Sequence, residues 1–210
     1  MSSAGAISED GRWVVIRERC CDDHAMSESP AEWLRREGAS TDVVSWASAY
    51  ATLDEAIAAC PRGDWVLAIA AKRGAEASAI VRAAARIAEL GTPYVRDAES
   101  EARASAAIAI AKRAADGEQI AASERAAAHG ALEEAIGRAM DPAAQSALMA
   151  ALAALTAIEA PIEAASTAAM IAQAAAMDAG ECAMTSALRW AQSESADIAR
   201  AELASSTTQG

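Results

Sequence analysis

Alanine dominates the second half of the chain, and no other feature constrains the fold as strongly. From residue 98 onward, alanine makes up roughly two-fifths of the residues, far above its ordinary usage. Alanine has the highest helix propensity and loses no side-chain entropy on ordering. The chain is also 53% hydrophobic but only 3% aromatic, without a phenylalanine. The sequence therefore predicts an all-α protein, a compact alanine-rich bundle of about seven to nine helices.

The 210 residues divide into an irregular segment and one helical domain. Residues 1–28 are expected to be irregular, and the segment GRWVVIRE fits either a short strand or a first helical turn. Residues 29–205 are expected to form a single all-helical domain. Within it, residues 29–97 contain shorter, tryptophan-bearing helices, and residues 98–205 form an alanine-rich bundle.

Capping residues place the first helices. Ser29 fits an N-cap and Pro30 the first helical position. Thr52 and Glu55 have the spacing of a capping box, in which each side chain bonds the other's backbone amide. The helix that follows is expected to end at Cys60, because a residue that precedes proline is disfavoured in the helical conformation.

The hexapeptide CPRGDW, residues 60–65, is expected to form a tight corner between two helices. Each residue except one has a structural role: proline stops the first helix, glycine turns the chain, Asp64 caps the next helix, and tryptophan anchors it in the core. Only Arg62 lacks such a role, so its guanidinium should pair with an acid on a neighbouring helix or point outward. The structural corner comprises Cys60, Pro61, Gly63 and Trp65. Arg62 and Asp64 are the candidate partner-binding residues.

Longer helices are expected in the rest of the chain, each bounded by glycine or proline. The predicted ranges are 64–74, 76–90, 99–116, 118–140, 142–160 and 162–203, the last broken near Gly180. Larger side chains at helical spacing are expected to mark the buried stripes. These side chains are Leu132, Ile136, Met140, Leu148, Leu152, Leu155, Ile162, Met170, Met177, Met184, Leu188 and Ile198.

No constellation with catalytic or metal-binding spacing stands out. Cys20, Cys21, Asp23 and His24 lie close together, but adjacent cysteines do not readily share one tetrahedral metal. The only other histidine, His129, has no glutamate three residues before it, as a di-iron bundle would need. Nucleotide-binding and hydrolase motifs are absent from the sequence. We expect no catalytic residues, no cofactor and no metal.

The net charge of −12 indicates which kinds of partner the protein could bind. An acidic surface repels nucleic-acid phosphates and attracts basic proteins. The N-terminus lacks the apolar region of a secretory signal, and no segment is apolar and long enough for a membrane span. Four cysteines without an export signal suggest reduced thiols, so a cytoplasmic location is expected.

The stretch LDEAIAACPRGDWVLAIAAKRGAEASAIVRAAARIAELGTPYV, residues 53–95, resembles the signature of a family of bacterial immunity proteins from polymorphic toxin systems. The preceding EWLRREG and SWASAYATLDEA fit the upstream tryptophan-bearing elements of that family. The chain departs from the family pattern at Ala68 and Ile69, where another tryptophan is usual, and Trp190 is the only tryptophan of its tail. The resemblance implies a cytosolic all-helical protein that binds a cognate toxin, and it implies no particular binding residues.

Three hypotheses follow from the sequence. The first is a non-enzymatic immunity protein that neutralises a basic, nuclease-like toxin by direct binding, as a monomer or homodimer. The second is a structural scaffold whose helices pair with copies of themselves or with another helical protein. The third, an enzyme built in a helical bundle, is disfavoured by the absence of recognisable ligands.

Overall fold

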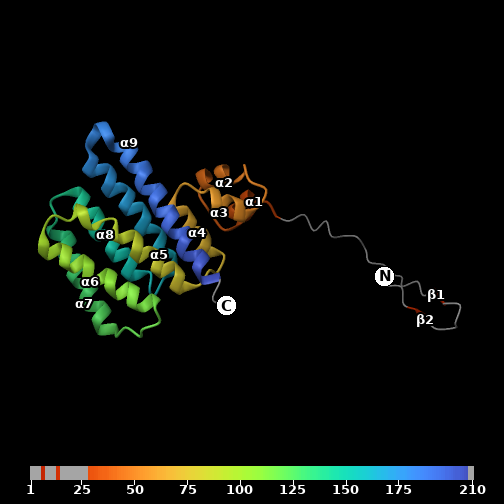
Figure 1. The fold of residues 1–210 in the computed structure, drawn as a ribbon, viewed down its shortest axis with the longest axis horizontal. Coiled ribbons are helices and arrows are strands. Elements are labelled where there is room, and N and C mark those ends of the chain that lie inside the picture. The colour runs from red at the N-terminus through yellow and green to blue at the C-terminus, as the bar shows by residue number, and fades with distance from the viewer. Residues whose placement is uncertain (1–5, 8–12, 15–27, 208–210) are drawn as a thin grey trace.

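The computed structural model describes residues 6–7, 13–14 and 28–207, and these residues form an α-helical bundle (Figure 1). Nine α-helices lie within the described part of the chain, at the upper end of the predicted number. The all-α prediction is thus confirmed. The described residues before the first helix form only two short strands, β1 (Ala6–Ile7) and β2 (Trp13–Val14), which pair antiparallel. Cys20, Cys21, Asp23 and His24 lie outside the described residues.

Three short helices begin the bundle: α1 (Pro30–Arg36), α2 (Thr41–Ala47) and α3 (Leu53–Ala59). The predicted caps are confirmed. Ser29 and Glu32 form a capping box on α1, and Thr52 and Glu55 form the predicted one on α3. These helices bury a small core of their own against α4. Its buried members are Leu34, Val43, Ala47 and Ile69.

The middle of the bundle consists of longer helices. They are α4 (Gly63–Lys72), α5 (Ala77–Glu89), α6 (Ala98–Ala115), α7 (Ala122–Arg138) and α8 (Pro142–Thr156). Short 3₁₀ turns η1 (Thr92–Tyr94) and η2 (Pro161–Glu163) precede α6 and α9. Asp141 caps α8 as predicted. Two predicted boundaries were wrong, because α7 starts four residues later than expected and α8 ends at Thr156.

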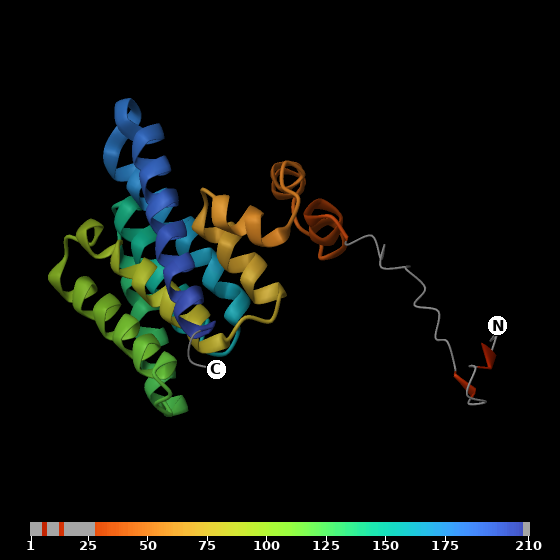
Figure 2. The same cartoon turned by 45° about the vertical axis from the view of Figure 1, so that its right-hand side comes forward.

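The last helix, α9 (Ala164–Thr207), is interrupted at Gly180, as the sequence predicted. Gly180 has φ 67° and ψ 179°, a conformation open essentially to glycine alone. We call residues 164–179 the first arm and residues 181–207 the second arm. Figures 1 and 2 show the two arms side by side, joined at an end that extends beyond the neighbouring helices.

Alanine fills much of the main core, which extends from Cys60 to Ala199. Its small side chain lets helices approach closely, and Gly91 shows how close this packing is. A Cβ atom at Gly91 would lie 2.7 Å from Ile171 Cδ1 and 3.2 Å from Ala147 Cβ. Gly91 therefore allows the first arm of α9 and α8 to pack against the end of α5, although its own φ of −84° is ordinary.

Several predicted core residues are exposed instead. Leu132, Leu148 and Leu155 are buried as expected. Met140 is 94% exposed because it lies in the connection between α7 and α8. Ile162 lies in η2, and Met177 and Met184 lie at the joined end of the two arms, so all three are nearly half exposed. Helical spacing predicts which side chains share a face, whereas the length of the neighbouring helices decides how much of that face is covered.

No helix in the described ranges combines the length and apolarity needed to cross a bilayer.

Candidate functional site at the helix corner

Residues 60–65 form the predicted corner between α3 and α4. Cys60 is the C-cap of α3 with an extended backbone, and Pro61 follows it. Helix α4 begins at Gly63, which makes Arg62 the N-cap. The prediction that Asp64 caps α4 was wrong: no side chain caps this helix, and Asp64 already lies within its first turn. Its carboxylate still lies where the helix dipole favours negative charge.

Arg62 and Asp64 form an ion pair with each other. Arg62 Nε lies 3.1 Å from Asp64 Oδ1, and Arg62 Nη2 lies 2.6 Å from Asp64 Oδ2. Such paired, charge-assisted bonds fix both side chains. The bond to Asp64 raises the pKa of Arg62. The Arg62 side chain remains 36% exposed and that of Asp64 18%. The expectation that Arg62 would reach another helix or point outward was therefore wrong, since its partner lies two residues along the chain.

Arg62 also covers an aromatic cluster. Its guanidinium carbon lies 4.4 Å from the centre of the Trp65 ring, within the range of a cation–π contact. Trp46 of α2 stacks at a tilt on Trp65, with ring centres 5.5 Å apart, and Tyr50 lies 5.2 Å from Trp46. All three aromatic residues are only partly buried. We call Trp46, Tyr50, Arg62, Asp64 and Trp65 the corner cluster.

A further acid lies near the corner cluster. Asp42, exposed in the first turn of α2, contributes to the raised pKa of Arg62 through its charge. Arg62 thus lies in the field of two carboxylates, Asp42 and Asp64. Arg62 is outnumbered by these two acids, which leaves a net negative potential beside the aromatic rings.

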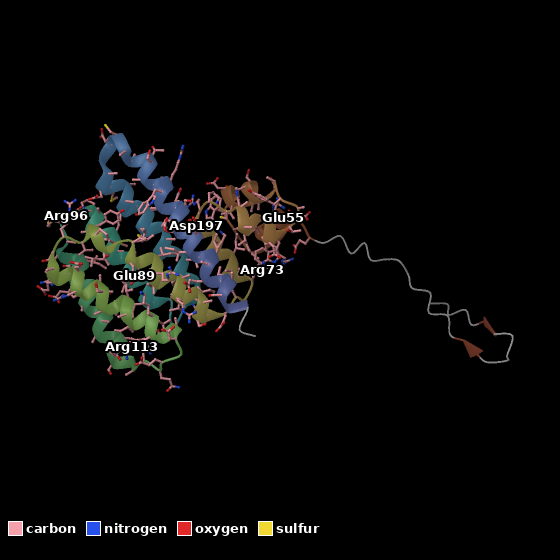
Figure 3. All side chains as sticks on the ribbon, in the orientation of Figure 1. Glu55, Arg73, Glu89, Arg96, Arg113 and Asp197 are labelled. Atoms are coloured by element: carbon pink, nitrogen blue, oxygen red, sulfur yellow. The ribbon has the colours of Figure 1, made fainter. Side chains whose placement is uncertain are left out.

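The inner side of the corner packs against the second arm of α9. Gly63 is buried against Ser195, and Arg200 donates from Nη1 to the carbonyl oxygen of Cys60 at 2.5 Å. Arg200 in turn binds Asp197 at 2.6 Å. Figure 3 labels Asp197 on α9, on the side of the bundle where α1–α3 lie. The last helix therefore holds the corner in place through contacts with the backbone of Cys60 and Gly63.

Cys60 is buried in the corner. Its thiol lies 3.4 Å from the carbonyl oxygen of Arg62, and burial raises its pKa to about 11. A thiol with such a pKa is protonated near neutral pH and is a poor nucleophile. Cys60 is thus a packing residue. Cys182, by contrast, is exposed on the second arm of α9.

Arg200 also lines a groove of about 780 Å³. It runs between α3, the turn from α4 to α5, and the end of α9, and its charged rim includes Asp54, Arg73 and Arg200. Arg73 is paired with Asp54, and Arg200 with Asp197. Both arginines are therefore neutralised by acids, and the remaining charged side chain of the groove, Glu76, accepts a hydrogen bond from Ser78.

Within the described ranges, no group of three or more His, Cys, Asp or Glu side chains is placed to hold a metal ion. His129 is half exposed on α7, with Nδ1 3.5 Å from a carboxylate oxygen of Glu133 one turn away. Neither described cysteine lies in a disulfide.

The structure gives the six consecutive corner residues partners that the sequence did not reveal. Trp46 and Tyr50 have the spacing of neighbours on a helix face, so their pairing had a local signal. The contact of Trp46 with Trp65 had none, because the two residues lie on α2 and α4, with α3 between them in the sequence. The same holds for Ser195 and Arg200, which lie more than a hundred residues along the chain.

Comparison with known proteins adds no identity: no family model, no curated protein and no solved structure matches this chain.

Proposed function

We propose that the protein is a non-enzymatic binding protein of the immunity type, which neutralises a cognate toxin in the cytoplasm by direct protein–protein contact. The observation that carries the proposal is the corner cluster. It gathers two tryptophans, a tyrosine and an arginine at one partly exposed site. Tryptophan, tyrosine and arginine are the residues most enriched among those that dominate binding energy at protein interfaces.

Preorganisation supports the same proposal. Arg62 is held by Asp64 and by the ring of Trp65, so little side-chain entropy remains to be lost on binding. The backbone beneath is fixed by Gly63 and Arg200. A rigid surface of aromatic and arginine side chains favours a tight complex, because a mobile surface would lose more entropy on binding.

Charge supports a basic toxin. The chain carries a net charge of −12, and Asp42 and Asp64 lie beside the aromatic rings. Opposite charge on the two partners accelerates association and makes its rate fall with ionic strength. A nuclease, whose substrate groove is basic, is the expected kind of target.

The test is binding of the full chain to the protein encoded by the neighbouring gene, measured by calorimetry and by association rate at several salt concentrations. We expect a stable complex, loss of toxin activity and slower association at high salt. Trp46→Ala and Arg62→Ala should weaken the complex by about 1–2 kcal/mol each or more. Arg73→Ala removes a similar ion pair outside the corner and serves as the control. Lack of binding to any such toxin contradicts the proposal.

A structural role is the second candidate. Large apolar side chains are exposed on α9: Met177 and Met184 lie at the joined end of the two arms, and Trp190 lies farther along the second arm. Such side chains favour contact with another helical surface. Light scattering tests self-assembly, because a protein that stays monomeric at all concentrations does not assemble with itself.

A further inference from the structure

The helix that follows Gly180 presents an exposed face with a symmetrical pattern. Glu181, Met184, Thr185, Leu188 and Arg189 follow the spacing i, i+3, i+4, i+7 and i+8, which places them on one side of a helix. Leu188 is partly buried against the core, and the other four are exposed. We call these five residues the tip face. It lies where α9 extends beyond its neighbours in both views (Figures 1 and 2).

The charges of the tip face are opposite and lie at its two ends. Glu181 and Arg189 are each four residues from Thr185. Within the described part of the chain, neither has an ion-pair partner. Arg35 is the only other described arginine of which this is true. Between the two charges lie Met184, 48% exposed, and Leu188.

We propose that the tip face binds the same face of a second copy of this chain, with the two helices antiparallel and a two-fold axis at Thr185. In this arrangement Glu181 of each copy lies opposite Arg189 of the other, so one contact forms two ion pairs. Met184 and Leu188 fill the space between them. A closed two-fold interface needs such a self-complementary surface.

Charge complementarity favours a second copy as the occupant. Two molecules of net charge −12 repel each other, so they can approach only where the local charge is balanced. On the tip face, Glu181 and Arg189 balance each other. The nearest acid along the first arm, Asp178, is already paired with Arg96 at 2.7 Å. The corner cluster, where Asp64 and the nearby Asp42 outnumber Arg62, instead suits a basic partner.

The size of the tip face sets the strength of the contact. A helical segment from Glu181 to Arg189 is roughly 13 Å long, so the interface is expected to be below about 1,200 Å², in the range of weak and transient contacts. The dimer should therefore form reversibly, with a dissociation constant on the order of micromolar or weaker. It does not depend on the toxin-binding proposal.

The test is sedimentation equilibrium of the full chain over a wide concentration range, with a reducing agent present because Cys182 is exposed nearby. We expect a concentration-dependent dimer. Glu181→Arg and Arg189→Glu should each weaken it about tenfold or more, because each places like charges opposite each other. The double variant E181R/R189E restores the opposite charges and should restore the dimer. Arg35→Glu, a charge reversal at another unpaired arginine, is the matched control. This variant should dimerise as the wild-type chain does.

Net charge cannot explain this pattern. Glu181→Arg changes the charge by +2, from −12 to −10, which lowers the overall repulsion and would favour association. Circular dichroism of each variant should match that of the wild-type chain, which checks that the helices are retained. A monomer at every concentration overturns the proposal, and so does a double variant that dimerises no better than the single ones.

Discussion

Gly63 at the start of α4 lies directly against Ser195 of α9. A Cβ atom at position 63 would lie 2.5 Å from Ser195 Cβ and 2.7 Å from its carbonyl carbon. The second atom belongs to the backbone of a helix and cannot move aside as a flexible side chain can. The glycine of the CPRGDW segment is therefore required by the close approach of two helices, since its own conformation is an ordinary helical one.

Gly63→Ala should destabilise the protein. Overpacking of a core contact typically costs about 1–3 kcal/mol, and here the helix backbone must shift. Chemical denaturation followed by tryptophan fluorescence measures the loss. Gly137→Ala is the matched control, because Gly137 lies in α7 with nothing within 4 Å of an added Cβ atom. That variant should gain about 0.5–1 kcal/mol from helix propensity. Equal stability of the two variants contradicts the packing described.

Gly180→Ala should weaken the joint between the two arms of α9. At φ 67° and ψ 179°, alanine is strained by about 1–3 kcal/mol, although no neighbouring atom would clash with its Cβ. The loss therefore comes from backbone conformation alone. A lower denaturation midpoint than that of wild type is expected, and Gly180→Asn should be destabilised as well, because asparagine tolerates the left-handed helical region but not a positive φ combined with ψ near 180°. A neutral alanine variant would be inconsistent with the observed turn.

Cys60 should be inert to thiol reagents. In a background with Cys20 and Cys21 replaced by serine, Ellman's reagent at pH 8 should label Cys182 rapidly and Cys60 only on unfolding.

The pKa of the Cys60 thiol rises from 9.0 to about 11 on folding, so the folded state favours the protonated form. This contribution to stability is present below pH 9 and is lost as the pH rises from about 9 to about 11. The stability difference between wild type and Cys60→Ala should narrow over that interval.

Arg86→Ala should lower the free energy of unfolding, because it removes an ion pair at the end of α9. Arg86 of α5 forms an ion pair with Glu202, whose side chain is only 10% exposed. Removal of the arginine leaves a nearly buried carboxylate without this partner, a change that costs about 1–3 kcal/mol. Glu202→Gln in the same chain should recover part of the loss, since the amide is neutral. Arg138→Ala, which removes pairs between exposed side chains, should cost less than about 1 kcal/mol.

Capping chemistry and alanine content determined much of the fold before any tertiary contact is considered. The boxes at Ser29–Glu32 and Thr52–Glu55 and the break at Gly180 depend on neighbours in the sequence, so local rules predict them. The same rules placed the corner between Cys60 and Trp65. They failed for Asp64, because its carboxylate could either cap the helix or pair with Arg62, and the two interactions compete for the same oxygens.

Tertiary structure alone decided what surrounds the corner and which apolar faces stay open. Nothing near position 63 in the sequence indicates that Ser195 will pack on Gly63 or that Arg200 will bind the Cys60 carbonyl. Met184 has the spacing of a core residue, yet it is exposed because α9 extends past the helices that would cover it. The sequence by itself determined where most helices begin and end, since those signals act over a few residues, although it misplaced the start of α7 and the end of α8. The distances between helices arise from the whole chain, because side-chain volumes from distant segments must fill one common interior.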